Sequence, residues 1–444
     1  MSGHRVLWSL LAAALLFAPA RNATAASHAG WTEALDKKGE FAFLQDWLIA
    51  DGCADNGFAF CKDFPKAVAG PAKWPAALIA AALKVSPNGN DLVSEACVSN
   101  WGCNNLVPSL ELLALRHKDE DKAQIAALMA DEKMWQGAKA NRRAVLIRIM
   151  AWTGDKSFAP RIAAMATFRP DDEYTMYALQ SAAALFTSWG DKSLVDACKA
   201  VFDPDFSPRG VDESRGVCAH YLLAVGDKSI VGKLKRNKLP NELYTQVTRA
   251  AMGDDSDKAD WANTAKSMAS SPDRDDLAAA LLSLALLGDA KAEKAFLTNV
   301  SSGNANVVFE HAKLVPIVAG LPIAKKIAAA VKKGLDKLGT KEKGGRAQAI
   351  LVAFLLKQGD ASALKNVKTL FASDDLDVRT ALAGNLAGNA GAMPMMLVSN
   401  GLAGGAPTPG LAAVLAEAYG NESDKGVRGT LAQAWAMLPA LGGI

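Results

Sequence analysis

The sequence predicts an all-α protein, built as a right-handed superhelical α-solenoid of helical pairs. Three observations favour this fold class. Half of the 444 residues are hydrophobic but only 7% are aromatic, and alanine, leucine and lysine dominate, a composition typical of helices. The tetrapeptide Gly-Asp-Lys-Ser occurs three times, at intervals of 36 residues. Apolar stretches of helical periodicity lie on both sides of each copy.

A secretory leader is expected at residues 1–25. His4 and Arg5 precede an apolar core at Val6–Phe17, and Ala23–Ala25 supplies a small-residue cleavage site. The core is shorter than the about 20 residues that a membrane helix needs. We therefore expect an exported bacterial protein without a membrane-spanning segment after cleavage, located in the periplasm or outside the cell.

Residues 26–103 are expected to form a helical cap, pinned by disulfides, on one end of the array. Repeat arrays need such caps to stay soluble, and an even number of cysteines in an exported chain favours disulfides. Six cysteines allow 15 pairings. Local closure favours three of them: Cys53–Cys61, Cys97–Cys103 and Cys198–Cys218. Four tryptophans are expected to pack in the cap, with stacking on sugars as the alternative: Trp31, Trp47, Trp74 and Trp101.

Residues 104–444 are expected to form the repeats, with each Gly-Asp-Lys-Ser as the turn between two helices. Glycine in the left-handed conformation ends the first helix, and Asp or Ser accepts hydrogen bonds from the first N–H groups of the second. A phosphate-binding loop is excluded, because it needs a different order of residues after a strand. The three copies begin at Gly154, Gly190 and Gly226, weaker turns at Gly253, Gly288, Gly359 and Gly388, and less clear ones at Gly320 and Gly420.

Apolar positions after the tetrapeptides match from unit to unit, which predicts one buried face on each second helix. One matched set directly follows the tetrapeptides, and the other lies further along the same face. The two sets are Phe158, Leu194 and Ile230, and Ile162, Cys198 and Leu234.

These units resemble HEAT repeats, in particular the short HEAT-like units associated with phycobiliprotein lyases. That pattern combines an acidic turn, a Val-Arg pair, a small-residue helix and a glycine turn. The best match is "SDDLDVRTALAGNLAGNAGAMPMMLVS", and the Val-Arg pair occurs again at Val427 and Arg428. The segment "DESRGVCAHYLLAVGDKSIVGKL" also matches, but its arginine, Arg215, is displaced from the position that the pattern gives it. The resemblance covers residues 104–440 and implies a helical solenoid that binds other macromolecules. The matching positions are Asp374, Asp377, Val378, Arg379 and Gly388.

No catalytic, cofactor or metal site is predicted. The acidic clusters lack the spacing of a calcium loop, and each precedes an apolar run, where carboxylates stabilise a helix start. Some HEAT-like enzymes bind two irons through several His-Glu pairs, but this chain has only the reversed pair Glu310-His311. His220, beside Cys218, is expected to pack within a helix. The clusters are Asp171–Glu173, Asp254–Asp260 and Asp273–Asp276.

A lysine-rich helix at "LPIAKKIAAAVKKGLDKLG" is the candidate binding surface. Its apolar side carries Ile323, Ile327, Val331, Leu335 and Leu338. Its other side carries the possible partner-binding residues Lys325, Lys326, Lys332, Lys333 and Lys337. A solvated outer face is the simpler interpretation, and docking to an acidic protein or an anionic surface is the functional one.

The leading hypothesis is an exported, non-catalytic scaffold that holds a protein or other macromolecular partner. Loss of the leader removes Arg5 and Arg21 and lowers the formal charge from +3 to +1, which gives no basis for nucleic-acid binding. One alternative is a lyase- or isomerase-like enzyme that uses the concave groove of the solenoid. The other is a structural component of an envelope or cell-surface assembly.

Overall fold

The structure, a computed structural model, describes about half of the chain, mostly in its second half. Nothing is described before residue 119. The described residues are 119–130, 143, 146, 147, 150, 151, 155–167, 176–206, 211–234, 239, 242–387, 408, 410–424, 427, 430, 431 and 434. The predicted leader, the predicted cap and the two cysteine pairs of that cap lie outside this part.

The described part of the chain is helical, and no strand occurs within it, which confirms the all-α prediction. Two compact units divide the chain: residues 1–182 with 411–444, and residues 183–410. In the first unit, Arg143 is buried and donates hydrogen bonds to the carbonyl oxygens of Met165 (3.0 Å) and Thr167 (3.1 Å). Its helices are α7 (Asp119–Ala130), η5 (Lys156–Phe158), α9 (Ala159–Ala166) and α23 (Leu411–Asn421), and α10 (Met176–Trp189) contains the boundary.

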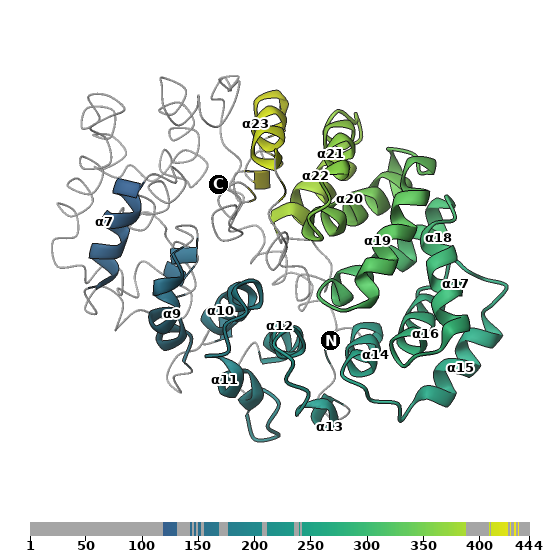
Figure 1. Ribbon diagram of the computed structural model, residues 1–444, viewed down its shortest axis with the longest axis horizontal. Coiled ribbons are helices and arrows are strands. Elements are labelled where there is room, and N and C mark those ends of the chain that lie inside the picture. The colour runs from purple at the N-terminus through teal and green to yellow at the C-terminus, as the bar shows by residue number, and fades with distance from the viewer. Residues whose placement is uncertain are drawn as a thin grey trace, which may run out of the picture. The chain divides into compact units, whose positions relative to one another are not determined.

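The second unit contains most of the described helices, which follow one another from teal to green in Figure 1. Its α-helices are α11 (Val195–Ala200), α12 (Val211–Ala224), α13 (Val231–Leu234), α14 (Glu242–Ala251), α15 (Lys258–Ser267), α16 (Asp275–Leu286), α17 (Ala290–Val300), α18 (Ala305–Ala312), α19 (Ile323–Gly334), α20 (Glu342–Lys357), α21 (Leu364–Phe371) and α22 (Leu376–Ala387). Its short 3₁₀ helices are η6 (Val315–Val318), η7 (Leu335–Lys337) and η8 (Ala361–Ala363).

Helices of the second unit contact one another in two rows. In the first row α12 contacts α14, and the contacts continue through α16, α18 and α20 to α22. In the second row α15 and α17 lie against α16, α17 also contacts α19, and α21 lies against α20 and α22. Consecutive helical pairs therefore share their apolar faces, because no pair of this size can bury its own.

Burial differs between the two rows in the way that this packing requires. In α16 residues 277–285 are all buried, and in α20 residues 347–356 are all buried. A helix that is apolar on every side must have neighbours on every side. Helix α19, in the second row, buries only one stripe, which includes Ile327 and Val331.

Turns of the predicted kind join the helices of five described pairs. Asp227 donates its N–H to Leu222 at 2.8 Å, and Gly226 donates its N–H to Leu223 at 3.1 Å, the two bonds of a Schellman motif. The Asp227 carboxylate then accepts from the N–H of Ser229 at 2.9 Å. Positive φ angles confirm the prediction at Gly190, Gly226, Gly253, Gly288 and Gly359. Gly154 and Gly388 lie outside the described residues.

Two of the less clear turns differ from expectation. Gly420 lies inside α23, so the turn expected there is wrong. Gly320 lies in a turn between η6 and α19 but lacks a positive φ angle. Here η6 takes the place of the glycine turn that follows α12, α14, α16 and α20.

The matched apolar positions are buried as predicted. Phe158, Leu194 and Ile230 are at most 4% exposed. The second matched set, Ile162, Cys198 and Leu234, is 0% exposed. The repeat in the sequence is therefore a repeat of buried contacts.

Candidate functional site

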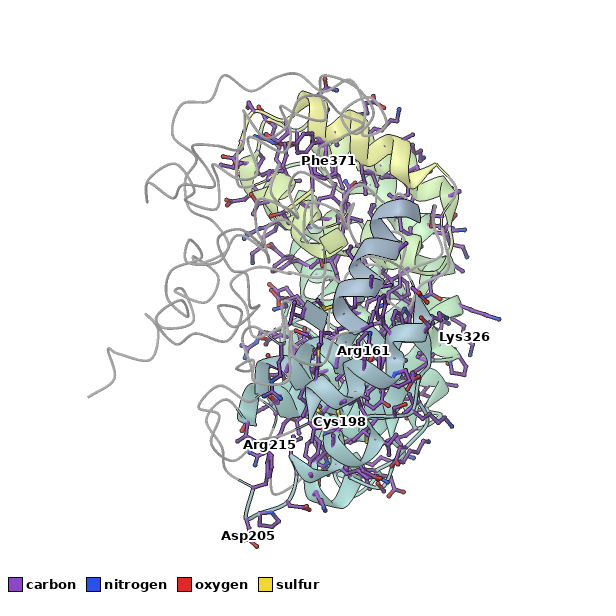
Figure 2. The ribbon with its side chains drawn as sticks, turned by 90° about the vertical axis from the view of Figure 1, so that its left-hand side faces the viewer. Arg161, Cys198, Asp205, Arg215, Lys326 and Phe371 are labelled. Carbon is purple, nitrogen blue, oxygen red and sulfur yellow. The ribbon has the colours of Figure 1, made fainter. Side chains whose placement is uncertain are left out.

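The predicted lysine-rich helix exists and consists of α19 with η7. Its apolar stripe is buried: Ile327 and Val331 are 0% exposed, and Ile323 is 8% exposed. Five exposed lysines, which we call the lysine face, lie on the other side: Lys325, Lys326, Lys332, Lys333 and Lys337. Figure 2 shows the side chain of Lys326 projecting away from the ribbon. The amphipathic prediction is confirmed.

Two residues of the lysine face pair with acids of neighbouring elements. The Nζ of Lys326 lies 2.7 and 2.9 Å from the carboxylate oxygens of Glu293 on α17. The Nζ of Lys332 lies 2.6 Å from Asp360, the residue before η8. The other three, Lys325, Lys333 and Lys337, make no ion pair with any residue that the structure describes.

The pairing with Lys332 lowers the pKa of Asp360. Partial burial favours the neutral carboxyl, but hydrogen bonds from Lys332 and Ser362 outweigh it and lower the pKa of Asp360. Asp360 also caps η8, because its Oδ1 accepts from the N–H of Ser362 at 3.1 Å. One carboxylate therefore serves both the turn after α20 and the contact with α19 of the preceding pair.

Neighbouring helices extend the positive charge around the lysine face. Exposed lysines stand on α17 and on α21, and Lys365 of α21 lies 3.3 Å from Asp336 of η7. Acids are interleaved with them, so the surface is mixed in charge with an excess of lysine. The lysines on these two helices are Lys291, Lys294, Lys365 and Lys368.

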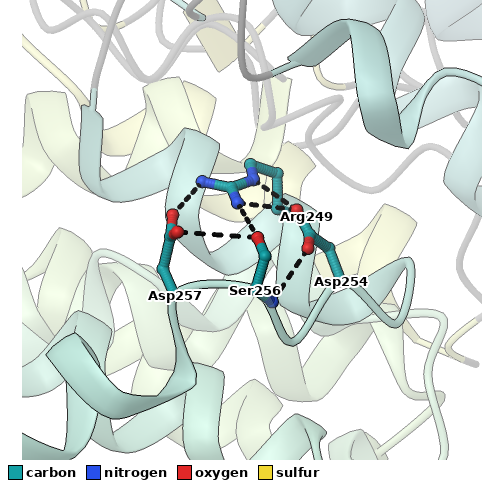
Figure 3. A network of polar contacts seen from close by, with 4 residues as sticks. All are labelled: Arg249, Asp254, Ser256 and Asp257. Atoms are coloured by element: carbon teal, nitrogen blue, oxygen red, sulfur yellow. Dashed lines mark hydrogen bonds and ion pairs between the residues drawn. The ribbon is translucent and has the colours of Figure 1, made fainter.

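The acidic cluster at Asp254–Asp260 is bound to an arginine. Arg249, near the end of α14, is 8% exposed and lies 2.6 Å from Asp254 and 2.5 Å from Asp257 (Figure 3). It also donates to the Ser256 hydroxyl at 2.9 Å. Partial burial opposes ionisation of Asp254, but hydrogen bonds from Ser256 and Arg249 outweigh it and lower the pKa of that carboxyl. These acids join α14 to α15.

The other acidic clusters agree with helix capping where they are described. Asp275 and Asp276 stand in the first turn of α16, as expected. The described part of the chain holds no group of three or more His, Cys, Asp or Glu side chains arranged to bind a metal ion. Asp171–Glu173 lies outside it.

Both described histidines are buried. His311 in α18 places Nδ1 2.8 Å from the carbonyl oxygen of Val307 and Nε2 3.1 Å from Asn299. Burial lowers its pKa to about 4, although the Val307 contact opposes the shift. His220 in α12 is 8% exposed, and its Nδ1 has no hydrogen-bond partner. Burial, and then the charge of Lys357, lower the pKa of His220 to about 3.

The described cysteines are neighbours. Cys198 on α11 and Cys218 on α12 are both fully buried and present as thiols, within hydrogen-bond contact of each other. Burial, followed by that contact, raises the pKa of Cys198 well above its usual value. The structure thus brings together the pair that local closure selected, and the disulfide itself stays a prediction.

The residues that carry the HEAT-like resemblance have structural roles. Asp374 places Oδ2 2.8 Å from Nζ of Lys341. The neighbouring Asp375 carboxylate accepts from the N–H of Asp377 at 3.0 Å at the start of α22 and from the N–H of Glu342 at 2.7 Å in the preceding pair. Val378 is fully buried. The Arg379 guanidinium donates to the Ser373 carbonyl oxygen at 2.7 Å. The acidic turn and the Val-Arg pair therefore connect adjacent helical pairs.

Comparison with known proteins gives no family for this chain. No family model, no curated protein and no solved structure matches it. Among the described residues, no helix has the length and hydropathy of a membrane span.

One polar group was not predicted from the sequence. Lys357, the last residue of α20, acts on His220 in α12. The available signal was a single lysine at the end of a long apolar stretch, Ala349–Leu356. The repeat places such a residue at the end of a helix but does not determine which other helix lies opposite.

Proposed function

We propose that this protein is an exported binding scaffold, an α-solenoid of HEAT-like pairs that holds a protein partner on its outer surface. The two rows of helices support a solenoid, because each pair packs on the next. The exported location rests on the predicted leader, and the cap and its disulfides rest on residues 26–103. Solenoids of this kind commonly bind other macromolecules.

The lysine face is the single observation that carries the proposed binding role. Lys325, Lys333 and Lys337 are exposed lysines that make no ion pair with a described residue, so no described acid has to be displaced when a partner's carboxylate binds them. The interleaved acids Glu293, Asp336 and Asp360 favour a folded protein with a mixed acidic surface over a uniform polyanion. Such charge complementarity steers association and sets specificity.

The test is charge reversal of the three unpaired lysines. The tagged mature chain and its Lys325→Glu, Lys333→Glu, Lys337→Glu variant are used to capture protein from the native envelope fraction. We expect the variant to recover about tenfold less of the partner, because three attractions become repulsions. Rising salt should weaken capture by the original chain as well.

A matched variant controls for net charge. Lys192, Lys228 and Lys258 are exposed lysines at turns or helix starts away from the lysine face, and changing all three to Glu alters the net charge equally. This variant should recover the partner normally. Equal recovery by both variants, each with an unchanged melting temperature, contradicts the role of the lysine face.

A further inference from the structure

A phenylalanine contacts two cations where the first-row helices α18 and α20 pack together. The Nζ of Lys313 and the Cζ of Arg346 each lie over the Phe309 ring, 5.4 Å from its centroid. Phe309 belongs to α18, Lys313 directly follows that helix, and Arg346 belongs to α20, which contacts α18. All three side chains are half-buried. Cations at this distance are attracted by the negative face of the ring.

One of the two cations is already neutralised. Lys313 forms an ion pair with Glu310, and the two side chains are only 17% and 13% exposed. The carbonyl oxygen of Lys313 also accepts from the hydroxyl of Tyr244, on α14, at 2.7 Å. These contacts hold Lys313 in place and neutralise it, so Arg346 supplies the net charge of the group.

Arg346 has no polar partner of its own. Its guanidinium makes no hydrogen bond and no ion pair with any residue that the structure describes, and its Nε is buried without a partner. Asp375, the residue before α22, does not serve as one, because its carboxylate accepts from three backbone N–H groups. Buried polar groups are nearly always hydrogen-bonded. An arginine with all five of its N–H donors unused is therefore unusual in a structural role.

The guanidinium is held in position although its donors are unused. Gly345, the residue before Arg346 in α20, packs so closely on α22 that an added Cβ would lie 2.5 Å from Cγ2 of Val378. Contact with the Phe309 ring orients the planar guanidinium. A group that is positioned in advance loses little conformational freedom on binding. Buried or half-buried arginine and aromatic side chains supply much of the binding energy at protein interfaces.

A carboxylate side chain matches this arrangement. A guanidinium binds the two oxygens of one carboxylate through two parallel hydrogen bonds. One negative charge balances the one cation of the group that lacks a partner, whereas a phosphate dianion would leave an excess. The exposed part of the Phe309 ring can contact apolar atoms next to the carboxylate.

We propose that Arg346 and Phe309 form a second docking site, which binds an aspartate or glutamate side chain and an adjacent apolar side chain of a partner protein. Both residues reach the surface on adjacent first-row helices, so a segment of a partner can lie across them. The lysine face belongs instead to α19 and η7. The site therefore goes beyond the proposed function and does not depend on it.

The experiment selects ligands for the full chain from phage-displayed random peptides. We expect the enriched peptides to carry Asp or Glu next to an apolar residue. The affinity of the most enriched synthetic peptide is then measured by fluorescence anisotropy. Arg346→Gln should weaken binding about tenfold, because the two charge-assisted hydrogen bonds are lost. Replacing the acid of the peptide by its amide should weaken binding equally, and this change tests the contact without altering the chain.

Three variants of the chain serve as comparisons. Phe309→Leu keeps an apolar side chain but removes the ring, and it should weaken binding about threefold. Lys258→Gln removes one positive charge from an exposed position on α15, and it should leave the affinity unchanged. The lysine-face variant Lys325→Glu, Lys333→Glu, Lys337→Glu should also bind the peptide normally.

Several results would overturn the second docking site. These are a failure to enrich any peptide, enriched peptides without an acid, and equal affinity of the original chain and Arg346→Gln. Displacement of the peptide by inorganic phosphate at a lower concentration than by acetate would indicate a phosphate site instead. Loss of binding in the lysine-face variant, with normal binding in Arg346→Gln, would place the peptide on the lysine face and contradict only the second site.

Discussion

Gly190 shows how one residue determines a turn between two helices. Its φ angle is +68°, and a Cβ atom added there would meet nothing within 4 Å. Space is therefore available for a side chain, and the constraint is in the backbone. Left-handed conformation disfavours residues with a Cβ, and β-branched residues most of all.

The corresponding prediction compares two glycines. We expect Gly190→Val to lower the free energy of unfolding by about 2 kcal/mol, because valine is strained at positive φ. Gly232→Ala is the control: it lies in α13 without a positive φ angle and with open space at its Cβ. It should be neutral or stabilising by about 0.5 kcal/mol through helix propensity. Urea unfolding measures both, and similar stability of Gly190→Val and the original chain contradicts the turn.

The two described histidines differ in their hydrogen-bond partners. His311 uses both ring nitrogens within the structure, to Val307 and to Asn299, whereas His220 leaves Nδ1 without a partner. The sequence predicts no catalytic role for either histidine, and it predicts that His220 packs within a helix. Only the partners in space distinguish a packing histidine from one with a vacant hydrogen-bonding position.

At the scale of elements, glycines allow neighbouring helices and loops to approach closely. Gly345 in α20 faces Val378 of α22 so closely that an added Cβ would lie 2.5 Å from Cγ2 of Val378 and 2.7 Å from the backbone of Thr340. Gly334 in α19 similarly faces the backbone of Ser301, with 2.6 Å available. Small residues at these points allow successive pairs to pack closely.

The prediction at this scale is that Gly345→Ala is destabilising although alanine favours helices. Either α22 or the loop before α20 has to move, and overpacking of this kind costs about 1–3 kcal/mol. Gly339→Ala, where an added Cβ meets nothing within 4 Å, should leave the free energy of unfolding nearly unchanged. Chemical denaturation of the two variants provides the comparison. Equal stability of the two variants would show that the α20–α22 contact adapts freely.

Ion pairs between consecutive pairs contribute less than this packing. Lys199 and Asp227 lie 2.7 Å apart, and the hydrogen bond from Lys199, followed by that from Ser229, lowers the pKa of Asp227 to about 2. Exposed pairs of this kind typically contribute under about 1 kcal/mol each. They lie between adjacent helical pairs and so favour the correct register of one pair on the next.

The response to acid is a property of the whole molecule. The pKa values of His311 and His220 are about 4 and about 3 in the folded chain, below the ordinary value of 6.5. The unfolded chain therefore binds more protons below pH 6.5, and the free energy of unfolding falls as the pH decreases from there. Each histidine contributes a slope of about 1.4 kcal/mol per pH unit until its folded pKa is reached.

We therefore expect stability to decline between pH 6.5 and pH 5, before most carboxylates titrate. In His311→Gln that slope should fall to about half, because one of the two buried histidines that the structure describes no longer binds a proton. Urea unfolding at several pH values measures the slope. An unchanged slope in His311→Gln would contradict the burial of a neutral imidazole at this position.

Local pattern by itself determined the helices, the turns between them and the faces that they bury. These features depend on interactions within about a dozen residues, so they can be predicted from the sequence. They are the left-handed glycine, the Asp cap and the matched apolar positions. The lysine face follows from the same helical periodicity. The expected turn at Gly420 failed because tertiary contacts can continue a helix through a glycine at a cost of about 1 kcal/mol.

Tertiary structure alone decided which distant residues meet. Arg249 pairs with Asp254 and Asp257, and Asp360 pairs with Lys332 of another helical pair. These contacts depend on how successive pairs rotate and stack, which is set by packing across the helices rather than by any local preference. The repeat therefore specifies the building unit, while the stacking of units creates the sites.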